Sequence, residues 1–168
     1  MAACAARARW AQAVLLWDVM QRYRVQPNSF SLNASMTACA RATQWLQSFS
    51  LLRVAHRCCI ELDTGAYASS LHACAAGAKW QAGLILLEEM RCREVLLTVA
   101  TLNSAISSCG NAGSWDQALA LLGDGQRSML SLDVIGCNAA MTALERGGHW
   151  QRCLDMLFRM REWRVCPV

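Results

Sequence analysis

The stretch "TLNSAISSCGNAGSWDQALALL", residues 101–122, holds two amphipathic helical patterns with a short break between them. The break is "GNAGS", and after it apolar residues recur at Trp115, Ala118, Leu119 and Leu122, the spacing of one helix face. Two helices with so short a connection pack antiparallel as a helical hairpin. The same break recurs as "ARATQ", "AAGAK" and "ERGGH". The sequence therefore predicts a hairpin that repeats along the chain.

The tryptophans give the period of this repeat. Five of the seven tryptophans are spaced by 35 residues, at Trp10, Trp45, Trp80, Trp115 and Trp150. An accidental lattice of this kind has a probability on the order of a few in a million, so an internal repeat comes before any other interpretation. We interpret each lattice tryptophan as a core residue that packs at the start of the second helix. The alternative, tryptophans that stack on a ligand, is disfavoured because the residues that follow face the core.

Anchored on the tryptophan, residues 1–168 divide into a single array of one partial and four full units. These are 1–28 (partial), 29–63, 64–98, 99–133 and 134–168. Two positions of the unit are apolar in every copy and are predicted to be buried. The first holds Met1, Met36, Leu71, Ile106 and Met141. The second holds Trp17, Leu52, Leu87, Leu122 and Leu157. A third is small in every copy, as close helix approach demands: Ala13, Ser48, Gly83, Ala118 and Cys153. One hairpin cannot bury its own apolar face, so the units must stack into an all-α solenoid.

Composition agrees with a soluble helical protein. Apolar residues make up 55% of the chain, and they are mainly Ala, Leu, Met and Cys rather than the β-branched residues typical of strands. No apolar run approaches the roughly 20 residues that a membrane-spanning helix needs. We expect no sheet and no membrane contact.

The cysteines are predicted to be core thiols. Cys4, Cys39, Cys74 and Cys109 occupy one unit position, and the fifth copy is Leu144, so an aliphatic side chain can replace this thiol. No CxxC occurs, and the pairs His56 with Cys58 and His72 with Cys74 are too few ligands for zinc. We expect no metal and no cofactor, and ten cysteines without a disulfide pattern favour a reducing compartment.

Basic residues give a mild signal for an anionic partner. The net charge is +4, and Lys79 is the single lysine among 16 basic residues, which favours planar contacts with phosphates or bases. Many arginines sit late in a second helix, where a cation complements the helix dipole: Arg22, Arg57, Arg91, Arg127 and Arg161. Arg41 and Arg146, each at the end of a first helix, are the candidates for phosphate contacts.

These units resemble the pentatricopeptide repeat (PPR) family. The signature lies in "SLNASMTACARATQW", "TLNSAISSCGNAGSWDQALALL" and "GCNAAMTALERGGHWQRCLDMLFRMREWRVCP". The resemblance implies 35-residue hairpins that stack into a superhelix and bind single-stranded RNA. The related tetratricopeptide repeat has a period of 34 and a different residue pattern, so the strict spacing argues against it.

The resemblance also implies that each unit reads one base with two or three side chains. It places the first reader at Asn33, Ala68, Asn103 and Asn138, and the second at the unit ends, Asn28, Asp63, Thr98, Asp133 and Val168. An asparagine amide offers donors and an acceptor to a base edge, and an aspartate can orient that amide. The stacking position holds Phe30, Gly65, Ala100 and Ile135, of which Phe30 and Ile135 are large enough to stack. The alternative role of the asparagines is to cap or brace the first helix.

The family's pairing rules give a short, loose RNA element. Asn with Asp favours uracil, Ala68 with Thr98 matches no recognised pair, and Asn138 beside Val168 leans to a pyrimidine. The implied element is uracil, any base, uracil, pyrimidine, which cannot specify one transcript. The expected partner is thus a single-stranded, pyrimidine-rich RNA.

We expect a binding protein rather than an enzyme. The HxE and CxxC signature of the deaminase-like domain and the clustered aspartates of the nuclease domain found in some family members do not occur, and no small-molecule substrate is expected. By resemblance the chain acts in organellar RNA processing, stability, editing or translation, with the plastid first and the mitochondrion second, although no clear transit peptide occurs. The alternatives are a protein-binding scaffold and a fragment of a longer array that lacks an effector domain. The uncapped ends could contact protein partners.

Overall fold

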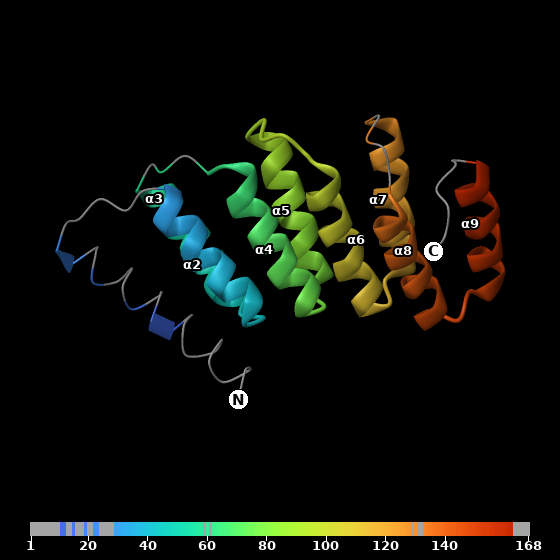
Figure 1. Cartoon of the computed structure of the whole chain (residues 1–168), viewed down its shortest axis with the longest axis horizontal. Coiled ribbons are helices and arrows are strands. Elements are labelled where there is room, and N and C mark those ends of the chain that lie inside the picture. The colour runs from blue at the N-terminus through green and yellow to red at the C-terminus, as the bar shows by residue number, and fades with distance from the viewer. Residues whose placement is uncertain are drawn as a thin grey trace.

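The computed structural model describes residues 11–12, 15, 19, 22–23, 29–58, 60, 62–128, 130 and 133–162. Within these ranges the chain forms eight helices and no strand (Figure 1). The helices are α2 (Ser29–Arg41), α3 (Trp45–Arg57), α4 (Thr64–Ala76), α5 (Trp80–Cys92), α6 (Val99–Ala112), α7 (Trp115–Arg127), α8 (Val134–Arg146) and α9 (Trp150–Glu162). The predicted all-α solenoid is confirmed. Several predicted positions lie outside the described residues: the partial unit 1–28 for the most part, with Met1, Cys4, Trp10, Ala13, Trp17 and Asn28, and also Val168.

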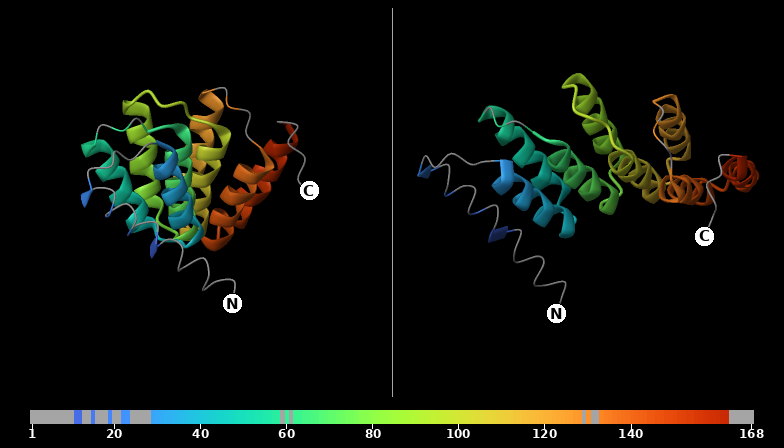
Figure 2. Two further views of the ribbon diagram at one scale, coloured as in Figure 1. Left: turned by 60° about the vertical axis from the view of Figure 1, so that its left-hand side comes forward. Right: turned by 45° about the horizontal axis from the view of Figure 1, so that its top comes forward.

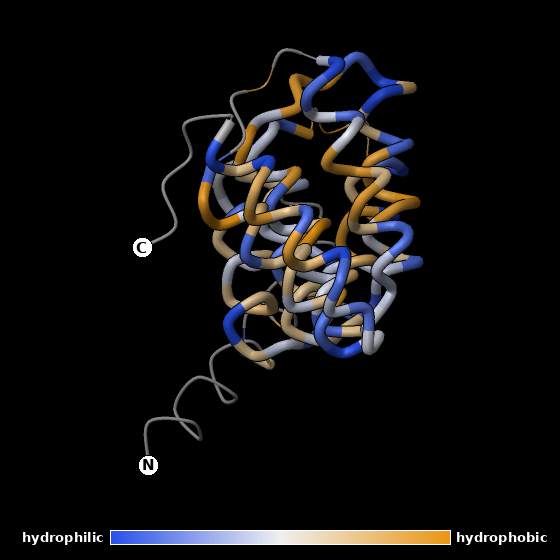
Figure 3. The backbone as a smooth tube through the Cα atoms, turned by 90° about the vertical axis from the view of Figure 1, so that its right-hand side faces the viewer, coloured by the Kyte–Doolittle hydropathy of each residue, from blue (hydrophilic) through white to orange (hydrophobic). Residues whose placement is uncertain are grey.

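The helices pair into hairpins that follow one another in chain order. Figure 1 and the right-hand view of Figure 2 show that α2 and α9 lie toward opposite ends of the row. The first helices α2, α4, α6 and α8 pack on one another in sequence. The second helices α3, α5 and α7 each pack on their own first helix and on the next one, and α9 packs on α8. Apolar and polar residues alternate along the helices (Figure 3), as an amphipathic pattern requires. The first helices therefore form one continuous layer of the solenoid.

The core follows the predicted lattice in the interior units. Met36, Leu71 and Ile106 are fully buried at one lattice position, and Leu52, Leu87 and Leu122 are buried at the other. The thiol position is also confirmed as core, because Cys39, Cys74, Cys109 and Leu144 are all buried. Burial raises the pKa of Cys39, Cys74 and Cys109 to about 11. These thiols are protonated packing groups rather than ligands or nucleophiles.

The tryptophan position differs from the prediction. Trp45, Trp80 and Trp115 are only partly buried and pack against the edge of the core. Trp150 is 66% exposed, and Leu157, seven residues further on, is 39% exposed. The prediction that these two are core residues is wrong.

The physical reason is that part of the cover of this ring comes from the turn of the following unit. A Cβ built on Gly77 would lie 3.1 Å from Cδ1 of Trp45, and one on Gly147 would lie 2.7 Å from Cδ1 of Trp115. Both glycines belong to the turn of the next unit. No turn among the described residues lies beyond Trp150, so its ring stays exposed.

Candidate nucleic-acid interface

Two aspartates at unit boundaries cap the helices that follow them. Asp63 precedes α4 and accepts a hydrogen bond through Oδ1 from the backbone N–H of Ala66 at 2.9 Å. Asp133 precedes α8 and accepts through Oδ1 from the N–H of Gly136 at 3.0 Å. Aspartate is a preferred N-cap because it satisfies an orphan donor and complements the positive end of the helix dipole. Local sequence thus places a carboxylate at each of these two boundaries.

Each capping aspartate also binds an asparagine from the first helix before it. Asn33 donates through Nδ2 to Oδ2 of Asp63 at 2.9 Å, and Asn103 donates through Nδ2 to Oδ1 of Asp133 at 2.8 Å. The two predicted readers of units 29–63 and 99–133 therefore meet in space. A carboxylate can only accept, so the contact settles which end of the amide faces it. The asparagines brace the caps of the following helices and do not cap a helix themselves.

The other amide atom of these asparagines has no partner. Oδ1 of Asn33 and Oδ1 of Asn103 are both buried without a hydrogen bond among the described residues. Leaving a buried acceptor unsatisfied costs about 1–3 kcal/mol, and such groups concentrate where a site serves function rather than stability. The second N–H of each Nδ2 is not used in the contact with the aspartate. The pair can therefore donate one hydrogen bond and accept another at the boundary between units.

The remaining two units lack this pair. Ala68 offers no polar side-chain atom, and Thr98 caps α6 in a capping box with Thr101, whose N–H donates to Oγ1 of Thr98 at 3.3 Å. Asn138 is exposed on α8. Its predicted partner Val168 lies outside the described residues. Within the described chain, the structure brings together two of the predicted reader pairs.

The stacking positions lie in the first turn of each first helix. Ile135 is 62% exposed there, and Gly65 and Ala100 are exposed at the equivalent places in α4 and α6. Phe30 belongs to α2, but its side chain is outside the described part of the structure. Ile135 is the one large described side chain at this position.

Comparison with known proteins shows what these units are similar to. The family model described as PPR repeat matches residues 100–128 and 136–165, which include Asn103 and most of α8. These two segments are similar to the pentatricopeptide repeat. A comparison with curated proteins finds no match.

Solved PPR structures share the fold. The PPR domain of protein-only RNase P 1 (PRORP1) from Arabidopsis thaliana, in complex with tRNA, is 13% identical with a TM-score of 0.79, and the match covers 97% of this chain and 86% of that one. The pentatricopeptide repeat protein PPR10, in complex with an 18-nt psaJ RNA element, is 20% identical with a TM-score of 0.77. That match covers 97% of this chain and 25% of PPR10, so the chain spans about a quarter of PPR10's length. At these identities the likeness is one of fold.

The predicted phosphate contacts lie at the other end of the first helices. Arg41 ends α2 and Arg146 ends α8, and both are exposed. The guanidinium of Arg146 donates to the carbonyl of Asn111 near the end of α6, and Asn111 donates through Nδ2 to the carbonyl of Ala75 at 2.9 Å. These bonds satisfy terminal helix carbonyls. Arg146 has five N–H donors, so it can bind a second acceptor at the same time.

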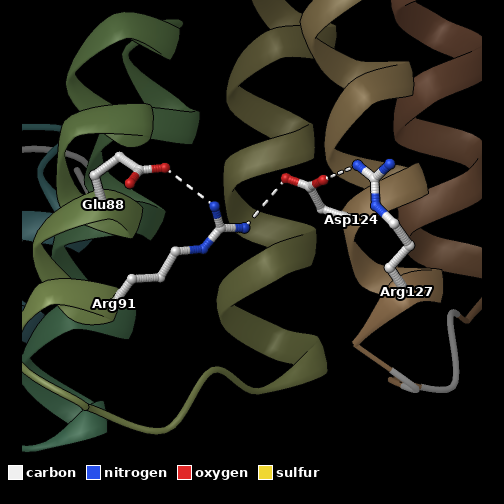
Figure 4. A network of polar contacts seen from close by, with 4 residues as sticks. All are labelled: Glu88, Arg91, Asp124 and Arg127. Carbon is white, nitrogen blue, oxygen red and sulfur yellow. Dashed lines mark hydrogen bonds and ion pairs between the residues drawn. The ribbon is translucent and has the colours of Figure 1, made fainter.

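Two other arginines are neutralised within the repeat array. Arg91 of α5 binds Glu88 at 3.1 Å and Asp124 of α7 at 3.1 Å, and Arg127 binds the second oxygen of Asp124 (Figure 4). The hydrogen bond from Arg127, supported by Arg91, lowers the pKa of Asp124. Both cations lie on second helices and already have anionic partners. Their role is structural: the pair of Arg91 with Asp124 joins two units, and the pair of Arg127 with Asp124 lies within α7.

One unit earlier, His56 and Glu89 make a contact equivalent to that of Arg91 with Asp124, and this contact was not predicted from the sequence. His56 Nε2 lies 2.6 Å from Oε1 of Glu89, which also accepts from the buried Tyr67 hydroxyl at 3.2 Å. Burial, followed by the charge of Glu89, raises the pKa of Tyr67 to about 12. His56 precedes Glu89 by 33 residues, as Arg91 precedes Asp124. That shared offset from a basic residue to an acidic one was the signal from which these contacts could have been predicted.

Proposed function

We propose that this chain binds single-stranded RNA along its first helices and reads individual bases at the Asn–Asp pairs. The observation that carries the proposal is the meeting of Asn33 with Asp63 and of Asn103 with Asp133 at the boundaries between PPR units. Two proteins of the same fold were crystallised with RNA. The proposal gives the chain a binding role and no catalytic one.

The chemistry of an Asn–Asp pair suits uracil. The pair presents one amide N–H and a carboxylate oxygen, and uracil presents a carbonyl oxygen beside an imide N–H. Cytosine has an unprotonated ring nitrogen in place of the imide N–H, and this nitrogen cannot donate to the carboxylate. Ala68 with Thr98 matches no recognised reading pair, and the predicted partner of Asn138 lies outside the described residues. The proposed element is therefore uracil, any base, uracil, pyrimidine.

Positions for stacking and phosphate contact complete the proposed site. The exposed Ile135, together with Phe30 at the equivalent sequence position, would stack against bases, and Arg41 and Arg146 would contact phosphates. We propose action on plastid transcripts, with the mitochondrion as the second choice, in processing, stability, editing or translation. This assignment is supported by the family resemblance.

A protein-binding scaffold is the second candidate, and one feature favours it. Helix α9 exposes Trp150, Leu154 and Phe158 beside a groove of about 620 Å³ that Trp150 and Met141 help to line. Exposed apolar groups of this kind mark protein contacts more often than nucleic-acid contacts. None of the described helices is long and apolar enough to cross a membrane.

Binding to short RNAs that differ at one nucleotide tests the proposal. At low salt, wild type should prefer uracil at the base that Asn103 faces, Asn103→Ala should lose about 1–3 kcal/mol of that discrimination, and Asn103→Thr should shift it toward guanine, as the family's pairing rules imply. Affinity should fall linearly with salt on a log–log plot because phosphate contacts release counterions. Binding without base preference would leave a non-specific RNA binder, and absence of binding at low salt would favour the scaffold.

A further inference from the structure

Gly136 shapes the pocket that holds the Asn103 amide. It is a buried residue in the first turn of α8, and its N–H donates at 3.0 Å to Oδ1 of Asp133, the oxygen that also accepts from Asn103. A Cβ built on Gly136 would lie 2.5 Å from Oδ1 of Asn103. Real Cβ atoms do not make so short a contact, so only glycine leaves room for the amide where it lies.

The second Asn–Asp pair is a natural comparison because alanine takes the glycine's place there. Ala66 donates its N–H to Oδ1 of Asp63, whereas Asn33 takes the other oxygen, Oδ2. Asn33 is half-exposed, while Asn103 is only 7% exposed. The two pairs thus differ in the depth of the amide and in which carboxylate oxygen it occupies.

This difference changes what each pair offers to a base. At Asp133, the helix N–H and the Asn103 amide share Oδ1, and Oδ2 makes no hydrogen bond among the described residues. At Asp63, each oxygen already accepts one bond. A carboxylate oxygen without a partner is a stronger acceptor for an imide N–H, and it repels the unprotonated ring nitrogen of cytosine more strongly.

We propose that Gly136 is a positioning residue for base recognition, which makes the Asn103–Asp133 pair the more discriminating of the two uracil sites. Because Gly136 has no side chain, the Asn103 amide can lie deep enough to donate to Oδ1 of Asp133. Oδ2 of Asp133 then remains as the acceptor for the base. The inference rests on the proposed RNA-reading function. It concerns the ratio of uracil to cytosine binding at one nucleotide.

The first test is Gly136→Ala, compared with wild type on RNAs that carry uracil or cytosine at one position. The new methyl group displaces the end of a short side chain and no backbone, and alanine favours a helix, so the fold should persist with an unchanged or slightly higher Tm. Wild type should prefer uracil by about tenfold or more at the Asn103 base. Gly136→Ala should lower that ratio to the smaller value found at the Asn33 base, and the Asn33 ratio itself should not change.

Two further variants complete the design. Ala66→Gly should raise the uracil preference at the Asn33 base, because it recreates the deeper pocket, and it does not depend on how well Gly136→Ala folds. Gly123→Ala is the control, because it makes the same exchange in α7, where the new Cβ would meet nothing within 4 Å and no proposed base-contacting residue is displaced. Its ratios should equal those of wild type.

The outcomes distinguish a failure of the positioning role of Gly136 from a failure of the proposed RNA reading. If wild type prefers uracil at the Asn103 base and Gly136→Ala keeps that preference, the positioning role is overturned while RNA reading stands. An unchanged ratio at the Asn33 base in Ala66→Gly overturns it as well. If wild type shows no uracil preference at either base, the proposed base reading fails, and the role of Gly136 fails with it.

Discussion

At the scale of single residues, the lattice tryptophan acts as a contact between units. Trp115 lies 4.4 Å from the His149 ring, centroid to centroid, and the Arg152 guanidinium stands 4.2 Å over it. Trp45 has Lys79 above its ring at 5.6 Å. Each ring is thus covered by an imidazole or a cation from the next unit, which adds a cation–π contribution to the burial of its surface.

This arrangement predicts unequal effects of truncating two tryptophans. Trp115→Ala should lower the free energy of unfolding by about 2–4 kcal/mol, somewhat less than for a fully buried aromatic residue. Trp150→Ala should cost less than about 1 kcal/mol, because its ring is mostly exposed. Urea unfolding of both variants beside wild type measures the difference. Equal losses would show that the two rings have the same cover, contrary to the structure.

At the scale of helices, close approach depends on small residues at the crossing points. A Cβ on Gly110 of α6 would lie 2.5 Å from the carbonyl oxygen of Ala139 in α8, a backbone atom that cannot move alone. Gly123 of α7 is the opposite case, since a Cβ there would meet nothing within 4 Å. One glycine sets the distance between two first helices, and the other only weakens its own helix.

The same substitution at these two glycines should therefore have opposite signs. Gly123→Ala should stabilise the chain by about 0.5–1 kcal/mol through helix propensity. Gly110→Ala gains the same propensity but must push α6 from α8, for a net loss of about 1–3 kcal/mol. Thermal melts measure both.

In wild type, amide exchange should be faster after Leu122 of α7 than after Leu87 of α5, and comparable protection would contradict the view that glycine weakens α7.

At the scale of the whole molecule, stability is spread along a row of units that contact only their neighbours. Such arrays open locally, unit by unit, rather than around one central core. The cysteines of the chain can report this local opening. Cys39, Cys74 and Cys109 lie at one position of three successive units, fully buried, while Cys58 and Cys92 are exposed.

Thiol alkylation should resolve these classes. With a pKa of about 11 for the three buried thiols, about one in a thousand is ionised at pH 8 even before access is considered. Cys58 and Cys92 should therefore react first, and Cys39, Cys74 and Cys109 only as their units open. Pulsed alkylation read by mass spectrometry follows each site. Rapid modification of Cys109 at a rate matching Cys92 would contradict its place in the core.

The sequence by itself determined the features that depend on local order. The period of the tryptophans, the helical hairpin and the core thiol follow from spacing, and the family resemblance of the sequence implied Asn33, Asn103, Asp63 and Asp133 as candidate readers. Helix periodicity and capping preference act over a few residues, and a strict repeat transfers each assignment to the next unit. For this reason the fold and the residue types of two reader pairs could be predicted.

Only the tertiary structure decided how neighbouring units meet. The exposure of Trp150, the ion pair of Arg91 with Asp124, and the choice of carboxylate oxygen by Asn33 and Asn103 each depend on atoms from different units or from across a unit boundary. Such distances change by ångströms with the stacking angle of the hairpins, which no residue pattern specifies. The role inferred for Gly136 also depends on the tertiary structure. The absence of a Cβ at Gly136 matters only because the Asn103 side chain, from another helix, lies 2.5 Å from where that Cβ would be.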